Sequence, residues 1–484
     1  MWPPHPSPLP RNTHQAKATS IAGERGQNLT VASFFDAPHP RDPFELSPMT
    51  ASDPSPKTYR ARWVWSDGRW LEGGRVTVVG RQIIAVGTDR QPNEIDLGDR
   101  VILPGLVNAH THLEFSGLSV PLPYETTFAS WICNVVQWRR GQTDASAKEA
   151  IELGLAESAR AGVTTLGEIS TRYWDAPTAL DATEVDLSGQ TATNPQLVVF
   201  DEILGLKPEA VQPQMADACR HLMVGATRPG EGEAPAEPRS SGDVASPSRL
   251  GESLALPASD WQPRWTAGLS PHAPYSVGGE LFAEVVRLSM AGDVPVAMHL
   301  AETQEELELL AAGTGPLAEL FSEWGLWTPG QRAAFQSPLE ALQQLSVLPR
   351  VLVIHGNYLT PDELDFLAGK DQFSVVFCPR THSYFQHEPY PLAALLKRGI
   401  RVALGTDSRA SNPDLNLLAE VQHVAQLHPE IAPCTLLEMA TRHGAGALGF
   451  GETIGQIAPG MRADFCVLPM RPDLRDPFEA VLSA

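Results

Sequence analysis

The sequence predicts an α/β protein in which a large barrel of βα units carries a small β domain. The chain has 484 residues, which suits a barrel with a minor domain better than one small domain. From Pro104 onward, short apolar strands alternate with amphipathic helices, the pattern typical of a parallel sheet. Both ends of the ordered chain instead show short β segments separated by turn residues.

Composition limits the classes of partner. The net charge is -21 and the pI about 5.1, without a basic stripe, so we expect neither nucleic acid nor an anionic membrane surface as a partner. There is no apolar run of about eighteen residues, so we expect no transmembrane helix. The 5 cysteines are scattered without a Cys-x-x-Cys pair, as in reduced cytoplasmic proteins. We expect a small-molecule substrate, with a homodimer as one possible assembly.

The two ends of the chain frame the barrel. Residues 1–56 are rich in Pro, Ser, His and Asn and lack a signal-peptide pattern, so we expect a disordered tail whose true start codon is open. Residues 57–103 contain three short β segments, each followed by a turn with glycine. Residues 453–484 return to this hairpin texture and are expected to rejoin the same small β domain.

The barrel is expected over residues 104–452. Ser146 to Glu149 form a capping box that opens a helix, and Gly162 closes that helix. A second capping box, Thr360 to Glu363, has Pro361 at the first helical position. The stretch 226–258 is dense in Gly, Pro, Ser, Glu and Ala, and we expect a disordered surface insertion there.

Polar residues follow five of the apolar strands. They are His110 and His112, His272, His299, His355 and Asp407. In a barrel of parallel strands the C-terminal edge holds the active site, so these side chains are expected to converge on one mouth. Any one histidine is more often structural, but the repeated placement favours a site.

Three imidazoles and one carboxylate suit a divalent ion such as zinc or iron. His110 and His112 lie two residues apart in a strand, so both can point to one metal. We assign His110, His112, His299 and Asp407 as ligands, leaving a position for water whose pKa the metal lowers. Glu302 lies where strand becomes loop and is the expected proton shuttle, the alternative being a solvated carboxylate at the start of an acidic helix.

His112-Leu113-Glu114 also matches the His-x-Glu of nucleobase deaminases built on another fold. Those enzymes need a Pro-Cys-x-x-Cys partner, which is absent from this sequence. We therefore reject that assignment.

The chain resembles the amidohydrolase superfamily, in the branch of mononuclear-metal deaminases and chlorohydrolases. The resembling motifs, in family order, are PGLVNAHTHLEFS, HAPYSV, HLAET, VIHGNYLT, CPRTHSYF, ALGTDS and IGQIAPGMRADF. The resemblance implies a (β/α)8 TIM barrel with a composite β-sandwich from residues 57–103 plus 453–484. It also implies the same ligands around one divalent metal, zinc with iron as the alternative, because no strand-end lysine could bridge two ions. It makes Glu302 the proton shuttle, His272 a substrate contact, and His355 and Asp407 the residues that handle the water proton and the tetrahedral centre.

The loop after His112 is also similar to that of aminodeoxyfutalosine deaminases, through Leu113 to Ser116, then Tyr124, Phe128, Trp131 and Arg139. The expected substrate contacts are His272, Glu114, Phe115, Trp131 and Arg380. The candidates for binding a substrate carboxylate are Arg139, Arg140 and Arg380. Thr381-His382 departs from the Ser-Asn found in much of the branch, which leaves the substrate open.

The sequence thus predicts a metal-dependent hydrolase that deaminates an amino-substituted heterocycle. The expected substrate is an adenine-type base or nucleoside, attacked by a metal-bound hydroxide. The alternatives are hydrolysis of another C–N or C–Cl bond, in guanine, cytosine or a triazine, and a non-catalytic scaffold of the same fold. A scaffold is expected to lack a ligand, and none is missing here.

Overall fold

The computed structural model describes residues 55–171, 195–225 and 265–483. The predicted insertion at 226–258, and all of the predicted tail except residues 55 and 56, lie outside these ranges. Within the described ranges, no helix combines the length and the apolar character that crossing a membrane requires.

Eight parallel strands form the central sheet and follow each other in chain order. Their apolar runs are buried on both faces, as a parallel sheet covered by helices requires. The strands are β8 (Leu106–Thr111), β9 (Val163–Ser170), β10 (Gln196–Ile203), β11 (Trp265–Pro271), β12 (Val296–Leu300), β13 (Val351–His355), β14 (Phe373–Phe377) and β15 (Val402–Leu404). The sheet closes where the amides of Thr406 and Asp407, after β15, each donate to the His110 carbonyl of β8 at 3.1 Å. The predicted barrel is therefore confirmed.

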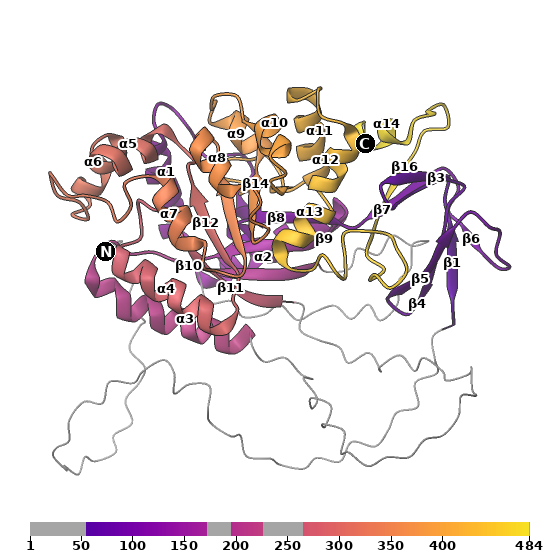
Figure 1. Cartoon of the computed structure of the whole chain (residues 1–484), viewed down its shortest axis with the longest axis horizontal. Coiled ribbons are helices and arrows are strands. Elements are labelled where there is room, and N and C mark those ends of the chain that lie inside the picture. Colours follow the sequence, from indigo (N-terminus) through magenta and orange to yellow (C-terminus); the bar gives the residue numbers. More distant parts are fainter. Residues whose placement is uncertain (1–54, 172–194, 226–264, 484) are drawn as a thin grey trace, which may run out of the picture. The chain divides into compact units, whose positions relative to one another are not determined.

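Helices surround the strands, as Figure 1 shows. They are α1 (Phe128–Arg140), α2 (Asp144–Arg160), α3 (Val211–Gly225), α4 (Gly279–Gly292), α5 (Gln304–Ala312), α6 (Pro316–Glu323), α7 (Pro338–Leu345), α8 (Pro361–Leu367), α9 (Pro379–Tyr384), α10 (Leu392–Lys397), α11 (Leu417–Leu427), α12 (Pro433–Met439) and α13 (Arg442–Leu448). The Thr360–Glu363 capping box opens α8 as predicted. At α2 the prediction was wrong by one turn. Thr143 is the N-cap and Ser146 its partner, because the hydroxyl of each accepts the other's backbone N–H.

The small β domain contains strands from both ends of the chain. One sheet has the order β5-β4-β1-β6 and the other β16-β7-β2-β3. The strands are β1 (Lys57–Arg60), β2 (Trp63–Ser66), β3 (Arg69–Glu72), β4 (Arg75–Val79), β5 (Gln82–Gly87), β6 (Ile95–Asp96), β7 (Arg100–Pro104) and β16 (Phe465–Pro469). Figure 1 shows the yellow β16 beside the indigo β7, and the two pair antiparallel with Cys466 opposite Leu103. The predicted composite of N- and C-terminal strands is confirmed, and a short helix, α14 (Pro477–Leu482), follows it.

The Pro-Gly turn joins the two parts of the fold. Gly105 connects β7 of the small domain to β8 of the barrel. A Cβ at this position would lie 2.1 Å from Thr164 Oγ1 at the start of β9, so only glycine fits without a shift. The turn thereby fixes where β8, with its two histidines, enters the barrel.

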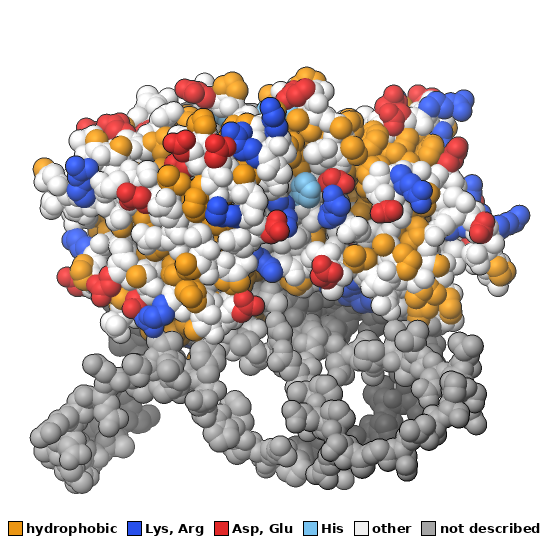
Figure 2. Space-filling view, viewed as in Figure 1, with side chains coloured by type: hydrophobic (Ala, Val, Ile, Leu, Met, Phe, Trp, Pro, Cys, Tyr) orange, Lys and Arg blue, Asp and Glu red, His pale blue; other side chains and the backbone are white. Residues whose placement is uncertain are grey.

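The face of the molecule in Figure 2 carries acidic and basic side chains interspersed, without one large field of either sign.

Candidate active site

Five polar side chains meet at the C-terminal mouth of the barrel. His110 and His112 come from β8, His299 from β12 and His355 from β13, and Asp407 follows β15 at the seam where the barrel closes. All five are buried. One ligand atom from each of His110, His112 and Asp407 lies within 4.8 Å of the others, and the same holds for His110, His299 and His355. The predicted convergence of these strand ends is what the structure shows.

The hydrogen bonding of these histidines fits a metal site. Both ring nitrogens of His110 and the Nδ1 of His112 are buried without a hydrogen-bond partner among the described residues. Their Nε2 atoms lie 3.4 and 3.7 Å from Asp407 Oδ1. His299 differs, because its Nδ1 lies 3.0 Å from the His272 carbonyl and so donates to it, leaving Nε2 as a free lone pair. Buried polar atoms are rarely left unpaired, so an ion between them accounts for the arrangement.

The protonation states agree with that fit. Burial, with smaller effects of neighbouring histidines, holds the pKa of His112 and of His299 well below the usual value. Burial acts to raise the pKa of Asp407, but the close approach and charge of His110, reinforced by His355 and His112, lower it well below its usual range. Neutral imidazoles beside an ionised carboxylate are the forms that bind a divalent ion.

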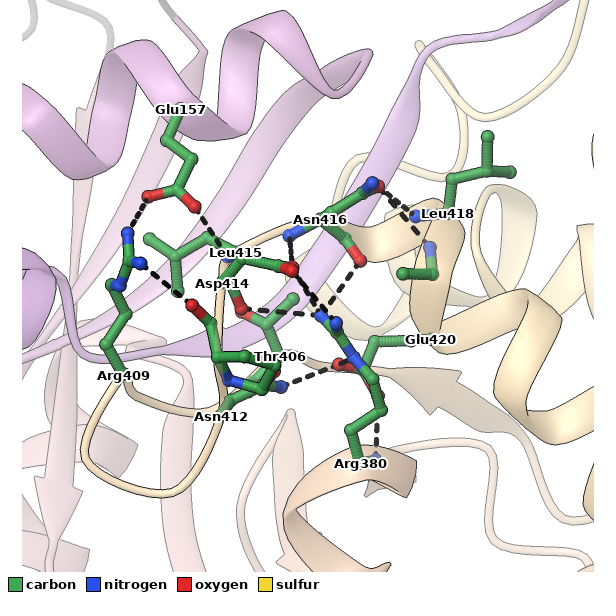
Figure 3. A network of polar contacts seen from close by, with 12 residues as sticks. Glu157, Arg380, Thr406, Arg409, Asn412, Asp414, Leu415, Asn416, Leu418 and Glu420 are labelled. Carbon is green, nitrogen blue, oxygen red and sulfur yellow. Dashed lines mark hydrogen bonds and ion pairs between the residues drawn. The ribbon is translucent and has the colours of Figure 1, made fainter. Parts of the chain in front are cut away.

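A polar network behind the site holds the loop of Asp407 (Figure 3). Ser411 Oγ donates to Asp407 Oδ2 at 2.9 Å. The amide of Asn412 donates to the Thr406 carbonyl at 2.8 Å and to Glu420 Oε1 at 2.7 Å. The loop is therefore fixed on both sides of the carboxylate by partners on α11 and within itself.

Arg380 belongs to this network. Its Nε donates to Glu420 Oε1 at 2.6 Å, and its Nη2 donates to Asp414 Oδ1 at 2.6 Å. It does not line the pocket described below. The predicted role of Arg380 in substrate binding stays a prediction, and the structure places its guanidinium against two carboxylates that the sequence does not reveal as its partners.

Replacing Arg380 with alanine is expected to lower the free energy of unfolding by about 3 kcal/mol, the cost of leaving one partner of a buried ion pair uncompensated. The Glu420 side chain is fully buried and would lose its cation. Chemical denaturation measures the change. KM is expected to stay unchanged, and an altered KM in folded R380A protein would support the substrate-binding role.

Arg398→Ala is the matched control. The Arg398 guanidinium pairs with Asp365, whose side chain is 68% exposed. Removing an exposed pair is expected to cost at most about 1 kcal/mol.

Glu302 lies beside the cluster in a rigid loop. Its Oε1 is 3.5 Å from His355 Nε2. Its backbone N–H donates to Glu306 Oε2 at 2.7 Å, and its carbonyl accepts from the Asn357 amide at 2.9 Å. Burial, reinforced by the charges of Asp407 and Glu306, holds the pKa of Glu302 well above 4.5. A protonated carboxyl group held in place at the mouth has the form of a general acid.

Three non-glycine residues around the cluster have left-handed backbone. They are Ala301 (φ 52°), His355 (φ 68°) and Asp407 (φ 54°). This conformation costs of the order of 1 kcal/mol or more per residue. Each residue lies where a strand turns into its loop, so the strain aims Glu302, His355 and Asp407 inward rather than along the strand.

The pocket above the cluster has aromatic walls. Phe115, Phe128, Trp131, Tyr275 and Phe321 line it, and the rings of Phe128 and Trp131 are stacked with centroids 5.5 Å apart. Of the expected substrate contacts, the structure places Phe115, Trp131 and His272 on the pocket wall. Flat rings at this position suit a planar heterocycle.

Glu114 lies behind the wall. It accepts from Arg139 Nη2 at 2.7 Å and from Thr171 Oγ1 at 2.9 Å, and it does not line the pocket. The prediction that Glu114 contacts substrate stays a prediction, and the structure shows its carboxylate bonded to Arg139 and Thr171. Arg139 does line the pocket, with one end of its guanidinium held by Glu114.

The sequence analysis missed two buried carboxylates at strand ends. Glu202 on β10 lines the pocket, and Glu168 on β9 accepts the Leu113 backbone N–H with both oxygens, at 3.1 and 3.0 Å. Each comes shortly after apolar strand residues, Glu202 two residues after Phe200 and Glu168 two residues after Leu166. Applying the strand-end criterion to carboxylates as well as to histidines would have found them.

The profile of the amidohydrolase family matches residues 101–482. A 5-methylthioadenosine/S-adenosylhomocysteine deaminase of Nitratidesulfovibrio vulgaris is 30% identical over 84% of this chain and 81% of its own length. An aminodeoxyfutalosine deaminase of Deinococcus radiodurans is 29% identical over 78% of this chain and 81% of its own length. A crystal structure of an adenosine deaminase from Xanthomonas campestris with bound zinc superposes with a TM-score of 0.63 at 23% identity, covering 90% of each chain.

Proposed function

The chain belongs to the amidohydrolase family, and on that premise we propose that it is a metal-dependent deaminase of an adenine-type nucleoside or base. Its relatives carry the names of adenosine-type deaminases, and the family hydrolyses carbon–nitrogen bonds with a divalent ion. The observation that supports the proposal most is the buried histidine cluster at the same mouth as Glu302, in which three ring nitrogens of His110 and His112 have no hydrogen-bond partner among the described residues.

We assign the metal to His110, His112, His299 and Asp407, with zinc as the first candidate and iron as the second. When bound there, a divalent ion supplies an activated water at neutral pH. The roles of His355, Glu302 and Asp407 are also proposals, and each is supported by the contacts of its side chain.

The chain's own groups can manage the protons. Glu302 donates a proton to the ring nitrogen beside the carbon that bears the amine, which makes that carbon electrophilic. His355 is the member of the cluster nearest Glu302, with its Nε2 3.5 Å from Glu302 Oε1. Its imidazole can form a hydrogen bond with the oxygen that adds to the ring carbon. Asp407, held ionised and fixed by Ser411, accepts a proton from the attacking water. The proton on Asp407 then passes to the amine, which leaves as ammonia, and the hydroxyl proton of the tetrahedral centre returns to Glu302, so that both carboxyl groups are restored.

The walls orient the ring. Phe115, Phe128 and Trp131 offer flat apolar surface on one side of the pocket, and Tyr275 and Phe321 close another side. A planar purine buries well between such rings, and the exclusion of water strengthens each polar contact at the reacting carbon.

The test is turnover of a panel containing adenosine, 5-methylthioadenosine, adenine, guanine, cytosine and a chlorotriazine, measured as ammonia release and, for the chlorotriazine, as chloride release. Turnover of the adenine compounds above the others is expected. Turnover of guanine, cytosine or the triazine without turnover of the adenine compounds would instead support the alternative, a hydrolase of another C–N or C–Cl bond. No turnover on any member by protein with a full complement of metal would favour the scaffold.

A further inference from the structure

We propose that Glu202 and His272 form a subsite that binds two adjacent sugar hydroxyls, so that the enzyme selects ribonucleosides over free bases. The inference rests on the proposed deaminase function and adds the substrate's second half. Glu202 lies near the C-terminal end of β10, and His272 follows β11, so neighbouring strands place them side by side on the pocket wall.

Glu202 carries an acceptor without a donor. Its side chain is only 1% exposed, and its Oε2 makes no hydrogen bond to any described residue. The nearest cation is Arg139, whose Nη1 lies 3.5 Å away, too far and too poorly aligned for a good hydrogen bond. A buried carboxylate oxygen left in this state on a pocket wall is poised to accept from a ligand.

The hydrogen bonds of His272 make its other nitrogen an acceptor too. Nδ1 of His272 lies 2.7 Å from Ser276 Oγ, and that hydroxyl donates its hydrogen to the Ala273 carbonyl at 3.1 Å. With that hydrogen directed to the Ala273 carbonyl, the histidine supplies the hydrogen of the first bond from Nδ1. Nε2 then keeps its lone pair, as in any neutral imidazole protonated on the other nitrogen.

The two acceptors cannot satisfy each other. Nε2 of His272 and Oε1 of Glu202 are 3.9 Å apart, beyond hydrogen-bond distance. Both line the same pocket, above the cluster where the base would react. A ligand that presents two neighbouring O–H donors completes both, one hydroxyl to each acceptor.

The charged side chains next to Glu202 disfavour a ligand anion at this point, and the neighbouring apolar wall disfavours a ligand cation. Arg139 is the one cation that lines the pocket among the described residues, and it is shared between Glu114 at 2.7 Å and Glu202 at 3.5 Å. Two carboxylates to one guanidinium leave negative charge, which repels a carboxylate. A ligand ammonium needs further acceptors for its three N–H groups, whereas the adjoining wall residues are the apolar Ile132, Val135 and Leu204. Neutral hydroxyls fit best, and Arg139 acts as the positioning residue for Glu202.

The first experiment needs no variant. We compare kcat/KM for adenosine, 2′-deoxyadenosine, 3′-deoxyadenosine, 2′,3′-dideoxyadenosine and adenine with the intact metal-loaded enzyme. Hydrogen bonds to a charged acceptor predict a loss of about 10- to 100-fold for the hydroxyl facing Glu202. Dideoxyadenosine turned over as well as adenosine would overturn the subsite and leave the deaminase assignment standing. No turnover of any adenine compound would instead remove the deaminase assignment and the subsite with it.

The second experiment uses Glu202→Gln and Glu202→Ala. In E202A the adenosine reaction is expected to fall about 10- to 100-fold while the dideoxyadenosine reaction stays near the wild-type value, so the ratio of the two collapses. E202Q, which keeps one carbonyl acceptor and the shape of the side chain, is expected to retain part of the ratio. Equal losses on both substrates would show a merely structural role and overturn the proposal.

Asp201→Asn is the matched control. Asp201 precedes Glu202 on β10, points to the opposite face of the strand, and has Asp217 and Arg220 of α3 as its charged neighbours. The ratio of the adenosine and dideoxyadenosine reactions is expected to be the wild-type ratio in D201N. Thermal unfolding of E202A, E202Q and D201N shows whether a loss of activity comes from unfolding or from weaker recognition of the sugar. The comparison of substrates with the wild-type enzyme does not depend on the stability of any variant.

Discussion

Glu302→Gln is expected to lower kcat by about 10² to 10⁴, the contribution of a well-placed general acid–base group. The amide keeps the size of the carboxyl group but has no acidic proton to give to the ring nitrogen. The backbone contacts that hold residue 302, to Glu306 and Asn357, do not use its side chain and remain. Steady-state kinetics on the best substrate of the panel measures the effect.

Metal content and melting temperature are the controls for E302Q, and both should match the wild-type enzyme. Glu308→Gln is the matched variant, because Glu308 is an exposed carboxylate on α5, the helix that follows the Glu302 loop, and it is bonded to Thr314. It should retain full activity. Undiminished turnover in E302Q would remove the proton shuttle from the proposed mechanism.

Asparagine variants of the cluster are expected to distinguish residues that bind the metal from residues that orient the reacting groups. His299→Asn and Asp407→Asn should each weaken metal binding by more than the roughly 10- to 100-fold typical of changes to residues that only contact ligands. Activity should be lost with the metal. Elemental analysis after dialysis against a chelator of graded strength gives the affinity, and zinc or iron(II) is added back to measure recovery.

His355→Asn is the informative comparison. His355 shares the cluster with His110 and His299, yet its Nε2 is 3.5 Å from Glu302 and its carbonyl accepts from Tyr390. As a residue that orients the reacting groups it should keep the metal and lose turnover. Loss of the metal in H355N with retention in D407N would exchange the two roles.

The barrel and its histidines were predictable because they depend on local pattern. A run such as Val351–Ile354 is apolar enough to be a buried strand, and the polar residue that ends it must lie at the barrel mouth. The closing strand β16 was predictable for a similar reason, since its hairpin texture differs from that of the barrel.

Other features depend on partners distant in sequence. Arg380 looks like a surface residue until α11 brings Glu420 beside it, 40 residues further along the chain. The role of Glu114 depends in the same way on Arg139 and Thr171. The left-handed backbone at Ala301, His355 and Asp407 has no signal in residue type, because glycine is the residue that usually marks it. These parts of the site required the assembled structure.

The composite β domain has a consequence for biosynthesis. The Ser66 hydroxyl donates to the Ile457 carbonyl 391 residues further along, and β7 completes its sheet only with β16. At about 5–20 residues per second, the ribosome leaves the early strands without these partners for roughly 20–80 s. Throughout that interval the nascent chain exposes an unpaired strand edge while the barrel is being made. Yield in cells should therefore depend on how well that edge is shielded during translation, even when the finished enzyme is stable.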